Sequence, residues 1–471
     1  MRIHFIGICG VAMSALATAF HNDSWDVTGS DVGFFPPISD YLKNNKIKFY
    51  PGWHVDKMMA GGTPNIIVVG NVAGSTNPEF AFAQENNLHY LSYPELIAEY
   101  IVQKNSIVCA GTYGKTSSTA LLTQILQKAN MDPSYMFGGL SINLKHSAKL
   151  KTDKNTWSVL EGDEYKTARW DNRPKFALYS PTHLLLTSAS WDHADIYPTE
   201  ESYFQAFRDL ITAIPDDGLI VACTDAKQIK ELINTKENKT RTITYSKNES
   251  ADYRYYDLKQ AQDGISFKIR NNDKEYAVQA PVLGEHMAEN ICGSFALAKE
   301  IGVDPNIILS AIAEFKGVKR RLEKRYTNDI TIYDDLAHSP TKATATLSTL
   351  RTIYPNSKIV AVFEPNTGNR KSQSAPGYAN AFKNADEVII PTLTKVKVNK
   401  DDIDPPFDAD ALQNIISQTH PNALFIPEDK DLIEHIKKTT SKGDVVVFLG
   451  SHGFRGMIDS LITSLHPPLP R

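Results

Sequence analysis

Apolar residues recur along the chain as short continuous runs that alternate with segments of helical pattern. Ile3–Ile8 and Ser106–Ala110 are such runs, and Val11–Phe20 has a helical pattern. Strands that are buried on both faces read as continuous apolar runs, so the alternation predicts parallel sheets with helical crossovers. Further strands are expected at residues 26–29, 65–69, 88–91, 156–160, 183–187, 219–223, 240–245, 330–333, 358–363, 387–390, 423–426 and 444–449, and further helices at 94–102 and from about Lys115, Asn290 and Pro305.

The pattern changes after Ser250, where apolar and polar residues alternate with a period of two. This period predicts an antiparallel flap, beside the second parallel sheet, made by residues 253–258, 264–269 and 275–280. A new set of alternating strands and helices begins near Asn105, and a third follows the basic stretch Lys319-Arg320-Arg321. We therefore expect an α/β protein with three domains, at residues 1–104, 105–317 and 318–471.

The composition narrows the class of protein. A length of 471 residues suggests about three domains of roughly 150 residues each, and 42% hydrophobic with 22% charged residues is typical of a soluble enzyme. A net charge of -4 gives no support for a nucleic-acid partner, and no apolar window is long enough to span a membrane. The cysteines form no C-x-x-C pair and no targeting segment is apparent, which predicts a cytoplasmic protein with reduced thiols. The composition leaves the oligomeric state open.

A short loop between an expected strand and an expected helix carries the clearest chemistry. It reads Gly111-Thr112-Tyr113-Gly114-Lys115-Thr116. Small residues let backbone N–H groups surround phosphate oxygens at a helix N-terminus, while the lysine reaches the terminal phosphates and the threonine binds Mg²⁺. Cys109 stands where the general phosphate-loop pattern has its first glycine, so this loop is a shortened form.

Acidic and imidazole groups follow two other expected strands of the same segment. Glu161 ends the strand before Asp163 and Glu164, and His193 lies between Asp192 and Asp195. Open α/β sheets bind ligands at the carboxyl ends of their strands, so we expect Glu161 to bind Mg²⁺ and His193 to bind a metal or act as an acid or base. A solvated acidic turn and a structural histidine are the alternatives.

The first and third segments offer weaker signals. Gly7 and Gly10 end the first strand in a turn that suits a pyrophosphate, although a plain tight turn reads the same way. Ser30 and Asp31 follow the next strand and suit a ribose or sugar, or a helix cap. In the third segment, acidic residues after a strand and the cation Arg321 suggest a second wall for a nucleotide.

These motifs follow one another along nearly the whole chain. They are Gly7-x-x-Gly10, Gly111–Thr116, Glu161-x-Asp163-Glu164, Asp192-His193-x-Asp195, His286-x-x-x-Asn290, Arg320-Arg321-Leu322-Glu323 and Asp334-Asp335-x-x-His338-x-Pro340. The ordered set closely resembles the Mur ligase family. The resemblance implies an N-terminal Rossmann-like domain for a UDP-sugar, a central ATPase-type domain and a C-terminal Rossmann-like domain for the incoming amine. It also implies an ATP-dependent amide ligase that works through an acyl phosphate.

The resemblance implies a role for each matching residue. Gly111 to Ser117 would bind the phosphates of ATP, with Lys115 stabilising the migrating charge. Thr116, Glu161 and His193 would bind Mg²⁺, and Asn290, Arg321 and Asp335 would contact the nucleotide. The UDP-sugar would lie against Gly7, Gly10, Ser30, Asp31 and Asn71. No residue is assigned as the base that deprotonates the amine.

Several stretches resemble the branch of the family that joins L-Ala-γ-D-Glu-meso-diaminopimelate to UDP-N-acetylmuramate in peptidoglycan recycling. They include Tyr165–Ala168, Asp171–Phe176 and Phe363-Glu364-Pro365. The same chemistry with L-alanine as the amine is the closest alternative, and a regulator that binds nucleotide and UDP-sugar without catalysis is an alternative from another class. An oxidoreductase would rest only on the Gly7 turn. The chain departs from the family pattern at Tyr113, Met287, Ser339 and residues 366–374.

Overall fold

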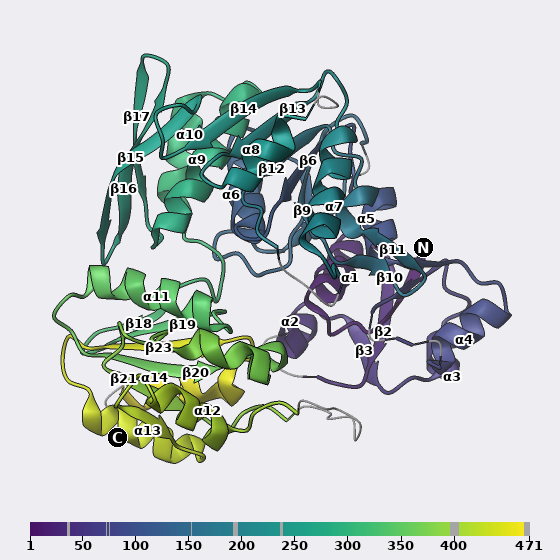
Figure 1. Cartoon of the computed structure of the whole chain (residues 1–471). Coiled ribbons are helices and arrows are strands. Elements are labelled where there is room, and N and C mark those ends of the chain that lie inside the picture. The colour runs from purple at the N-terminus through teal and green to yellow at the C-terminus, as the bar shows by residue number, and fades with distance from the viewer. Residues whose placement is uncertain are drawn as a thin grey trace, which may run out of the picture. The chain divides into compact units, whose positions relative to one another are not determined.

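A computed structural model describes residues 1–34, 38–71, 73–74, 76–151, 153–191, 196–235, 239–395 and 405–465. The chain forms two compact units (Figure 1). The first unit comprises Met1–Lys259, Ile265–Pro281 and Glu285–Val318, and the second comprises Gln260–Gly264, Val282–Gly284 and Lys319–Arg471. Each is an α/β structure, as the alternating pattern predicts.

The first sheet of the first unit is parallel and has the order β3-β2-β1-β4-β5. Its central strand, β1, is buried along its whole length, which explains the continuous apolar run at the start of the chain. The strands are β1 (Arg2–Ile6), β2 (Asp26–Asp31), β3 (Lys48–Pro51), β4 (Ile66–Val69) and β5 (Tyr90–Ser92), and the helices are α1 (Val11–Asn22), α2 (Ile38–Asn44), α3 (Val55–Met59), α4 (Pro78–Glu85) and α5 (Tyr93–Tyr100).

The second sheet of the first unit has the order β17-β16-β15-β14-β13-β12-β6-β9-β7-β8. Its parallel part comprises β14 (Arg241–Ser246), β13 (Leu219–Cys223), β12 (His183–Leu186), β6 (Asn105–Ala110), β9 (Trp157–Gly162) and β7 (Ser134–Met136), and β8 (Ala148–Lys149) forms one edge. The expected flap is confirmed as β15 (Tyr253–Ala261), β16 (Gly264–Asn271) and β17 (Lys274–Ala280). It extends the same sheet, because β15 pairs with β14.

The helices of this sheet are α6 (Lys115–Lys128), α7 (Glu200–Thr212), α8 (Lys227–Ile233), α9 (Glu285–Glu300) and α10 (Pro305–Glu314). The expected start of α9 near Asn290 is wrong, because the helix already begins at Glu285. Gly284 has a φ of 98°, a conformation that helical residues do not adopt, so the helix starts directly after this glycine. Asn290 therefore lies in the second turn of α9.

A small hairpin leaves the second sheet after β9. Its strands are β10 (Lys166–Ala168) and β11 (Asp171–Pro174), and the short helix η1 (Lys175–Leu178) follows. Trp170 at the turn packs against Phe80 of α4 and Tyr90 of β5, with ring centroids 5.4 and 5.6 Å apart. The hairpin thereby connects the two sheets of the first unit.

The described residues of the second unit form a sheet with the order β18-β19-β23-β20-β21-β22, in which β18 runs antiparallel to β19 and the other neighbouring strands are parallel. Its elements are β18 (Glu323–Thr327), β19 (Thr331–Asp335), α11 (Pro340–Ile353), β20 (Ile359–Glu364), η2 (Thr367–Arg370), η3 (Ser372–Tyr378), β21 (Glu387–Ile390), α12 (Ala409–Ser417), β22 (Ala423–Phe425), α13 (Asp429–Thr439), β23 (Val445–Gly450), η4 (Phe454–Gly456) and α14 (Met457–Leu465).

Alternate residues of these strands point into two different hydrophobic cores. Ala361 and Phe363 of β20 join residues of α11, α12 and η3 in the core of one face. Val360 and Val362 join residues of α13 and α14 in the core of the other face. Helices therefore cover both faces of the sheet, as in other open parallel sheets. Across the ranges that the structure describes, no helix is both long and apolar enough to cross a membrane.

Candidate active site

The loop between β6 and α6 has the backbone of a phosphate cradle. Gly111 has a φ of 139° and Gly114 a φ of 82°, which side-chain-bearing residues rarely adopt. A Cβ on Gly111 would lie 2.6 Å from the backbone oxygen of Ser188, and one on Gly114 would lie 3.0 Å from Cγ of Asn290. Both positions therefore require glycine, because of the backbone conformation and because a side chain would not fit. They lie just before the N-terminus of α6.

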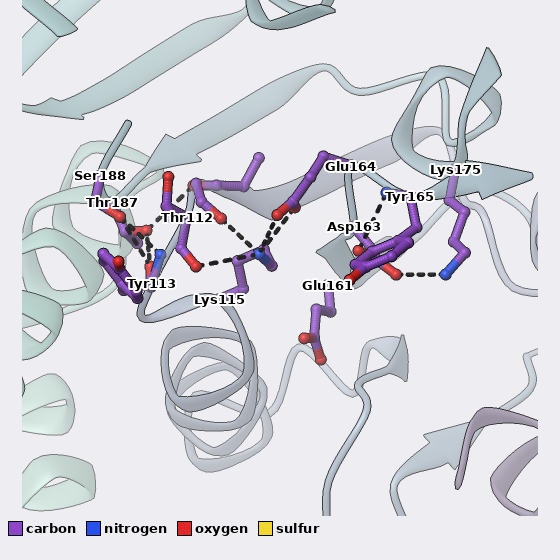
Figure 2. A network of polar contacts seen from close by, with 12 residues as sticks. Thr112, Tyr113, Lys115, Glu161, Asp163, Glu164, Tyr165, Lys175, Thr187 and Ser188 are labelled. Carbon is purple, nitrogen blue, oxygen red and sulfur yellow. Dashed lines mark hydrogen bonds and ion pairs between the residues drawn. The ribbon is translucent and has the colours of Figure 1, made fainter. Parts of the chain in front are cut away.

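Lys115 is held inside this loop by the Glu164 carboxylate and by the backbone carbonyls of Gly111 and Thr112 (Figure 2). Its Nζ donates to the Gly111 carbonyl at 2.6 Å and to Oε2 of Glu164 at 2.9 Å. The Lys115 and Glu164 side chains are 13% and 1% exposed, so the ion pair is shielded from solvent. The carboxylate positions the ammonium group over the loop, where a phosphate oxygen would be its natural competitor.

Glu164 belongs to a motif that the sequence already singles out, but no role was predicted for it. The sequence indicates Glu164 only by its position, three residues after Glu161 at the same strand end. The chain turns after β9 and brings its carboxylate to Lys115, which a strand pattern cannot reveal.

Thr116 and Glu161 form an oxygen-rich pair beside the loop. The Thr116 hydroxyl donates to Oε1 of Glu161 at 2.8 Å, and the backbone N–H of Gly138 donates to Oε2 at 2.6 Å. A hydroxyl and a carboxylate are the ligands that Mg²⁺ accepts next to nucleotide phosphates. These residues fit a Mg²⁺ ion. The structure places the two predicted metal ligands Thr116 and Glu161 within hydrogen-bond distance of each other. Ser117 follows in α6 and is 8% exposed.

Asn290 approaches the loop from α9. It is 4% exposed and packs against Gly114, so the structure brings these two predicted residues together. Glu289, the residue before it, has its pKa raised to about 7, first by burial and then by the charges of Asp225 and Glu285.

Tyr113 forms the exposed tip of the loop and is half exposed. Its backbone N–H donates to the Ser188 hydroxyl at 2.8 Å, and its carbonyl accepts from the Thr187 hydroxyl. Figure 2 shows these two residues, which follow β12, directly beside the loop. The backbone of Tyr113 is thus fixed by the two residues that follow β12.

A second ion pair lies on the far side of Glu161, where Lys175 binds the carboxylate of Asp163 (Figure 2). Burial raises the pKa of Asp163, but the Lys175 and Lys115 ammonium groups outweigh it and hold the pKa below its ordinary value. Lys175 also lies over the rings of Tyr93 and Tyr165, at 5.1 and 5.4 Å from their centroids.

The predicted sugar-site residues lie at the carboxyl edge of the first sheet. The Gly7 N–H donates to the Ser30 carbonyl at 2.8 Å, and Asp31 accepts from the Cys9 N–H at 2.8 Å, so the β2 end supports the turn that contains Gly10. The Ser30 hydroxyl is fully buried and donates to Glu79 at 2.5 Å.

Asn71 lies beyond β4, and its carbonyl accepts from Nε of Arg169 in the β10–β11 hairpin at 3.2 Å. A residue of the β10–β11 hairpin therefore contacts the segment that was expected to bind the UDP-sugar.

The predicted nucleotide contacts of the third segment lie in the second unit. Arg321 is exposed. Asp335 accepts from the Leu322 N–H at 2.6 Å and from the Ala337 N–H at 2.9 Å, so its carboxylate stabilises the local backbone. The neighbouring Arg320 donates to the carbonyls of Gly450 and His452. His193 and its neighbours 192 and 194–195 lie outside the described residues.

Models of one protein family match three consecutive stretches of the chain. Residues 2–105 match "Mur ligase family, catalytic domain", residues 109–298 match "Mur ligase middle domain" and residues 320–452 match "Mur ligase, glutamate ligase domain". The UDP-N-acetylmuramate–L-alanine ligase of Pelagibacter ubique is 31% identical over 461 residues, which cover 95% of each chain. The chain belongs to the Mur ligase family. Members of this family are ATP-dependent ligases that form amide bonds, and this chain is therefore an ATP-dependent carbon–nitrogen ligase.

Relatives with two different acceptors are equally similar to this Mur ligase. The UDP-N-acetylmuramate–L-alanyl-γ-D-glutamyl-meso-2,6-diaminoheptandioate ligase of Haemophilus influenzae is also 31% identical, over 79% of this chain and 81% of its own. A solved murein peptide ligase from Psychrobacter arcticus matches all of both chains with a TM-score of 0.72 and 27% identity. Overall identity therefore does not distinguish a single amino acid from a peptide as the acceptor.

Proposed function

We propose that this Mur ligase joins the tripeptide L-Ala-γ-D-Glu-meso-diaminopimelate to UDP-N-acetylmuramate, with ATP as the phosphoryl donor. The observation that carries the chemistry is the convergence of Lys115, Thr116 and Glu161 at one helix N-terminus. The choice of a peptide rests on Tyr165–Ala168 and Asp171–Phe176, which resemble the peptide-adding branch. These stretches contain both strands of the β10–β11 hairpin.

The reaction consists of two substitutions. A carboxylate oxygen of the muramyl group attacks the γ-phosphorus of ATP, the bond to the β–γ bridging oxygen breaks, and ADP leaves. The alanine nitrogen of the peptide then attacks the acyl carbon, gives up a proton, and expels phosphate that carries the former carboxylate oxygen. Activation is required because a free carboxylate is a poor electrophile.

The loop residues have distinct tasks in this proposal. The N–H groups between Gly111 and Ser117 bind the phosphates, and Lys115 moves from Glu164 to the phosphoryl oxygens as their charge grows. Glu164 thus holds the ammonium group ready without ATP. Asn290 of α9 packs against Gly114 of the phosphate loop. In this proposal its side chain also contacts the adenine.

Mg²⁺ fits the oxygen pair beside the loop. Thr116 and Glu161 would hold the ion, with His193 at a second one, and Mg²⁺ supplies positive charge to the phosphates when it is bound. The Gly138 N–H that donates to Glu161 fixes the carboxylate in place.

The three predicted domains divide the substrates between them in this proposal. Residues 1–104 would bind the UDP-sugar through Gly7, Gly10, Ser30, Asp31 and Asn71. Residues 105–317 would bind ATP, and residues 318–471 would bind the incoming amine. Arg321 and Asp335 would meet the nucleotide from the third domain.

A competition between two amines tests the proposal. Purified protein receives ATP, Mg²⁺ and UDP-N-acetylmuramate with either the tripeptide or free L-alanine, and the products are identified by mass spectrometry. We expect a higher kcat/KM with the tripeptide. A higher value with L-alanine would assign the chain to the alternative that its Pelagibacter relative supports. Phosphate release without any amide product would support a regulator instead.

A further inference from the structure

The carboxyl ends of β20 and β23 form a switch point in the second unit's sheet. The two strands are parallel neighbours, and Glu364 pairs in register with Gly450. After β20 the chain continues to η3, whose Tyr378 packs in the core of one face. After β23 it continues to α14, whose Leu461 packs in the core of the opposite face. Ligands of open α/β sheets bind where neighbouring strands send their connections to opposite faces.

Glu364 has an unused hydrogen-bonding oxygen at this point. Its side chain is 0% exposed, and Oε1 accepts from the Thr394 N–H at 2.7 Å. Oε2 has no hydrogen-bond donor among the residues that the structure describes. A buried carboxylate oxygen without a donor is unfavourable, so a donor from a ligand would relieve a cost that the fold itself leaves in place.

A histidine and an arginine lie beside Glu364, and both side chains are partly exposed to solvent. His452 Nδ1 lies 3.6 Å from Oε1, and Arg455 Nη1 lies 3.9 Å from Oε2, too far for a hydrogen bond. Their side chains are 42% and 36% exposed. Arg455 has a φ of 52° and forms an ion pair with Asp429 at 2.6 Å. This ion pair holds the Arg455 guanidinium beside the Glu364 carboxylate, without a hydrogen bond between them.

A carboxylate oxygen that lacks a donor, flanked by a guanidinium and an imidazole, is complementary to a zwitterionic amino-acid group. The ligand's ammonium would donate to Oε2 of Glu364, and its carboxylate would accept from Arg455 and His452. Arg370 does not compete for this oxygen, because its guanidinium donates to the carbonyls of Pro365 and Thr394.

We infer that Glu364 is a specificity-determining residue that binds a non-reacting ammonium group of the acceptor. The inference rests on the proposed function, because the diaminopimelate end of the tripeptide carries such an ammonium beside a carboxylate. L-Alanine does not, since its only amine is the nucleophile and must lose its charge to react. Glu364 thus selects an acceptor that has a second amino group.

The test compares two acceptors in the full-length protein. One is the tripeptide, and the other is the same peptide with 2-aminopimelate in place of diaminopimelate, which lacks only the distal amine. For the wild type we expect KM to be about 10- to 100-fold higher for the amine-free peptide, with a smaller change in kcat. The Glu364→Gln variant should have similar KM values for both peptides.

Glu387→Gln is the matched control. Glu387 is a buried carboxylate of the same sheet, but its oxygens bind Lys358 and His435. This variant should keep the preference for the tripeptide.

Each outcome decides a separate question. Equal KM values of the wild type for both peptides would overturn the inference alone, and this comparison involves no variant that could fail to fold. A Glu364→Gln enzyme that keeps the preference would overturn it as well. A wild type that ligates L-alanine and neither peptide would overturn the proposed function and the inference together.

Discussion

Replacing Gly114 by alanine removes the conformational freedom on which the nucleotide loop depends. The residue has a φ of 82°, and a left-handed conformation costs a residue with a side chain about 1–2 kcal/mol. The added Cβ would also lie 3.0 Å from Cγ of Asn290 and closer to its Oδ1. Asn290 is 4% exposed and has little room to yield, so overpacking adds about 1–3 kcal/mol. We therefore expect Gly114→Ala to lower the free energy of unfolding by about 2–5 kcal/mol in total.

Gly302→Ala separates the two contributions. Gly302 has a φ of 95°, but nothing lies within 4 Å of a Cβ at this position. Gly302→Ala should lower the free energy of unfolding only by the cost of the left-handed backbone conformation, about 1–2 kcal/mol. The readouts are thermal melting and the Kd of a non-hydrolysable ATP analogue by calorimetry. Gly114→Ala should melt at a lower temperature than Gly302→Ala, and it alone should weaken nucleotide binding, by at least about 10-fold. Equal melting temperatures together with unchanged nucleotide affinity would refute the reasoning.

Three further predictions concern charged groups within residues 105–317. Lys115→Ala should lower ligase turnover by at least about 100-fold while calorimetry shows unchanged UDP-sugar binding; equal loss of both would contradict separate sites. Glu164→Gln should destabilise the protein by about 1–3 kcal/mol because the buried Lys115 ammonium loses its anion, and an unchanged melting temperature would argue against this. Glu289 has a pKa raised from its ordinary 4.5 to about 7, so the folded state binds its proton more tightly and stability falls as pH rises between these values. At pH 8, Glu289→Gln should therefore have a higher melting temperature than the wild type, with a gain in unfolding free energy of at most about 3 kcal/mol. At pH 4 the two proteins should melt at the same temperature. An equal difference in melting temperature at both pH values would show that the charge of Glu289 is not the cause.

The sequence predicted the strands that are buried on both faces. Leu219–Cys223 was predicted with the bounds that the structure has, because a central parallel strand is continuously apolar. The β10–β11 hairpin was not predicted, because Lys166–Ala168 and Asp171–Pro174 are short and polar. Its stability comes from contacts such as Trp170 on Phe80, about 90 positions away in the chain, which no local pattern contains.

The candidate site was predictable where its chemistry is local. Gly111, Gly114, Lys115 and Thr116 follow from the spacing of one loop, and the structure joins Thr116 to Glu161 as the motifs suggest. Contacts between distant segments could not be read in this way. The burial of the Ser30 hydroxyl against Glu79 depends on how α4 packs, and this remote partner leaves no trace near Ser30.

An isotope-transfer experiment tests the ligase mechanism most directly. UDP-N-acetylmuramate labelled with ¹⁸O in its muramyl carboxylate is incubated with ATP, Mg²⁺, the tripeptide and the protein, and the released phosphate is analysed by mass spectrometry. The acyl-phosphate route predicts one ¹⁸O atom in the phosphate for each amide formed, together with ADP. Unlabelled phosphate, or ¹⁸O in AMP, would contradict it.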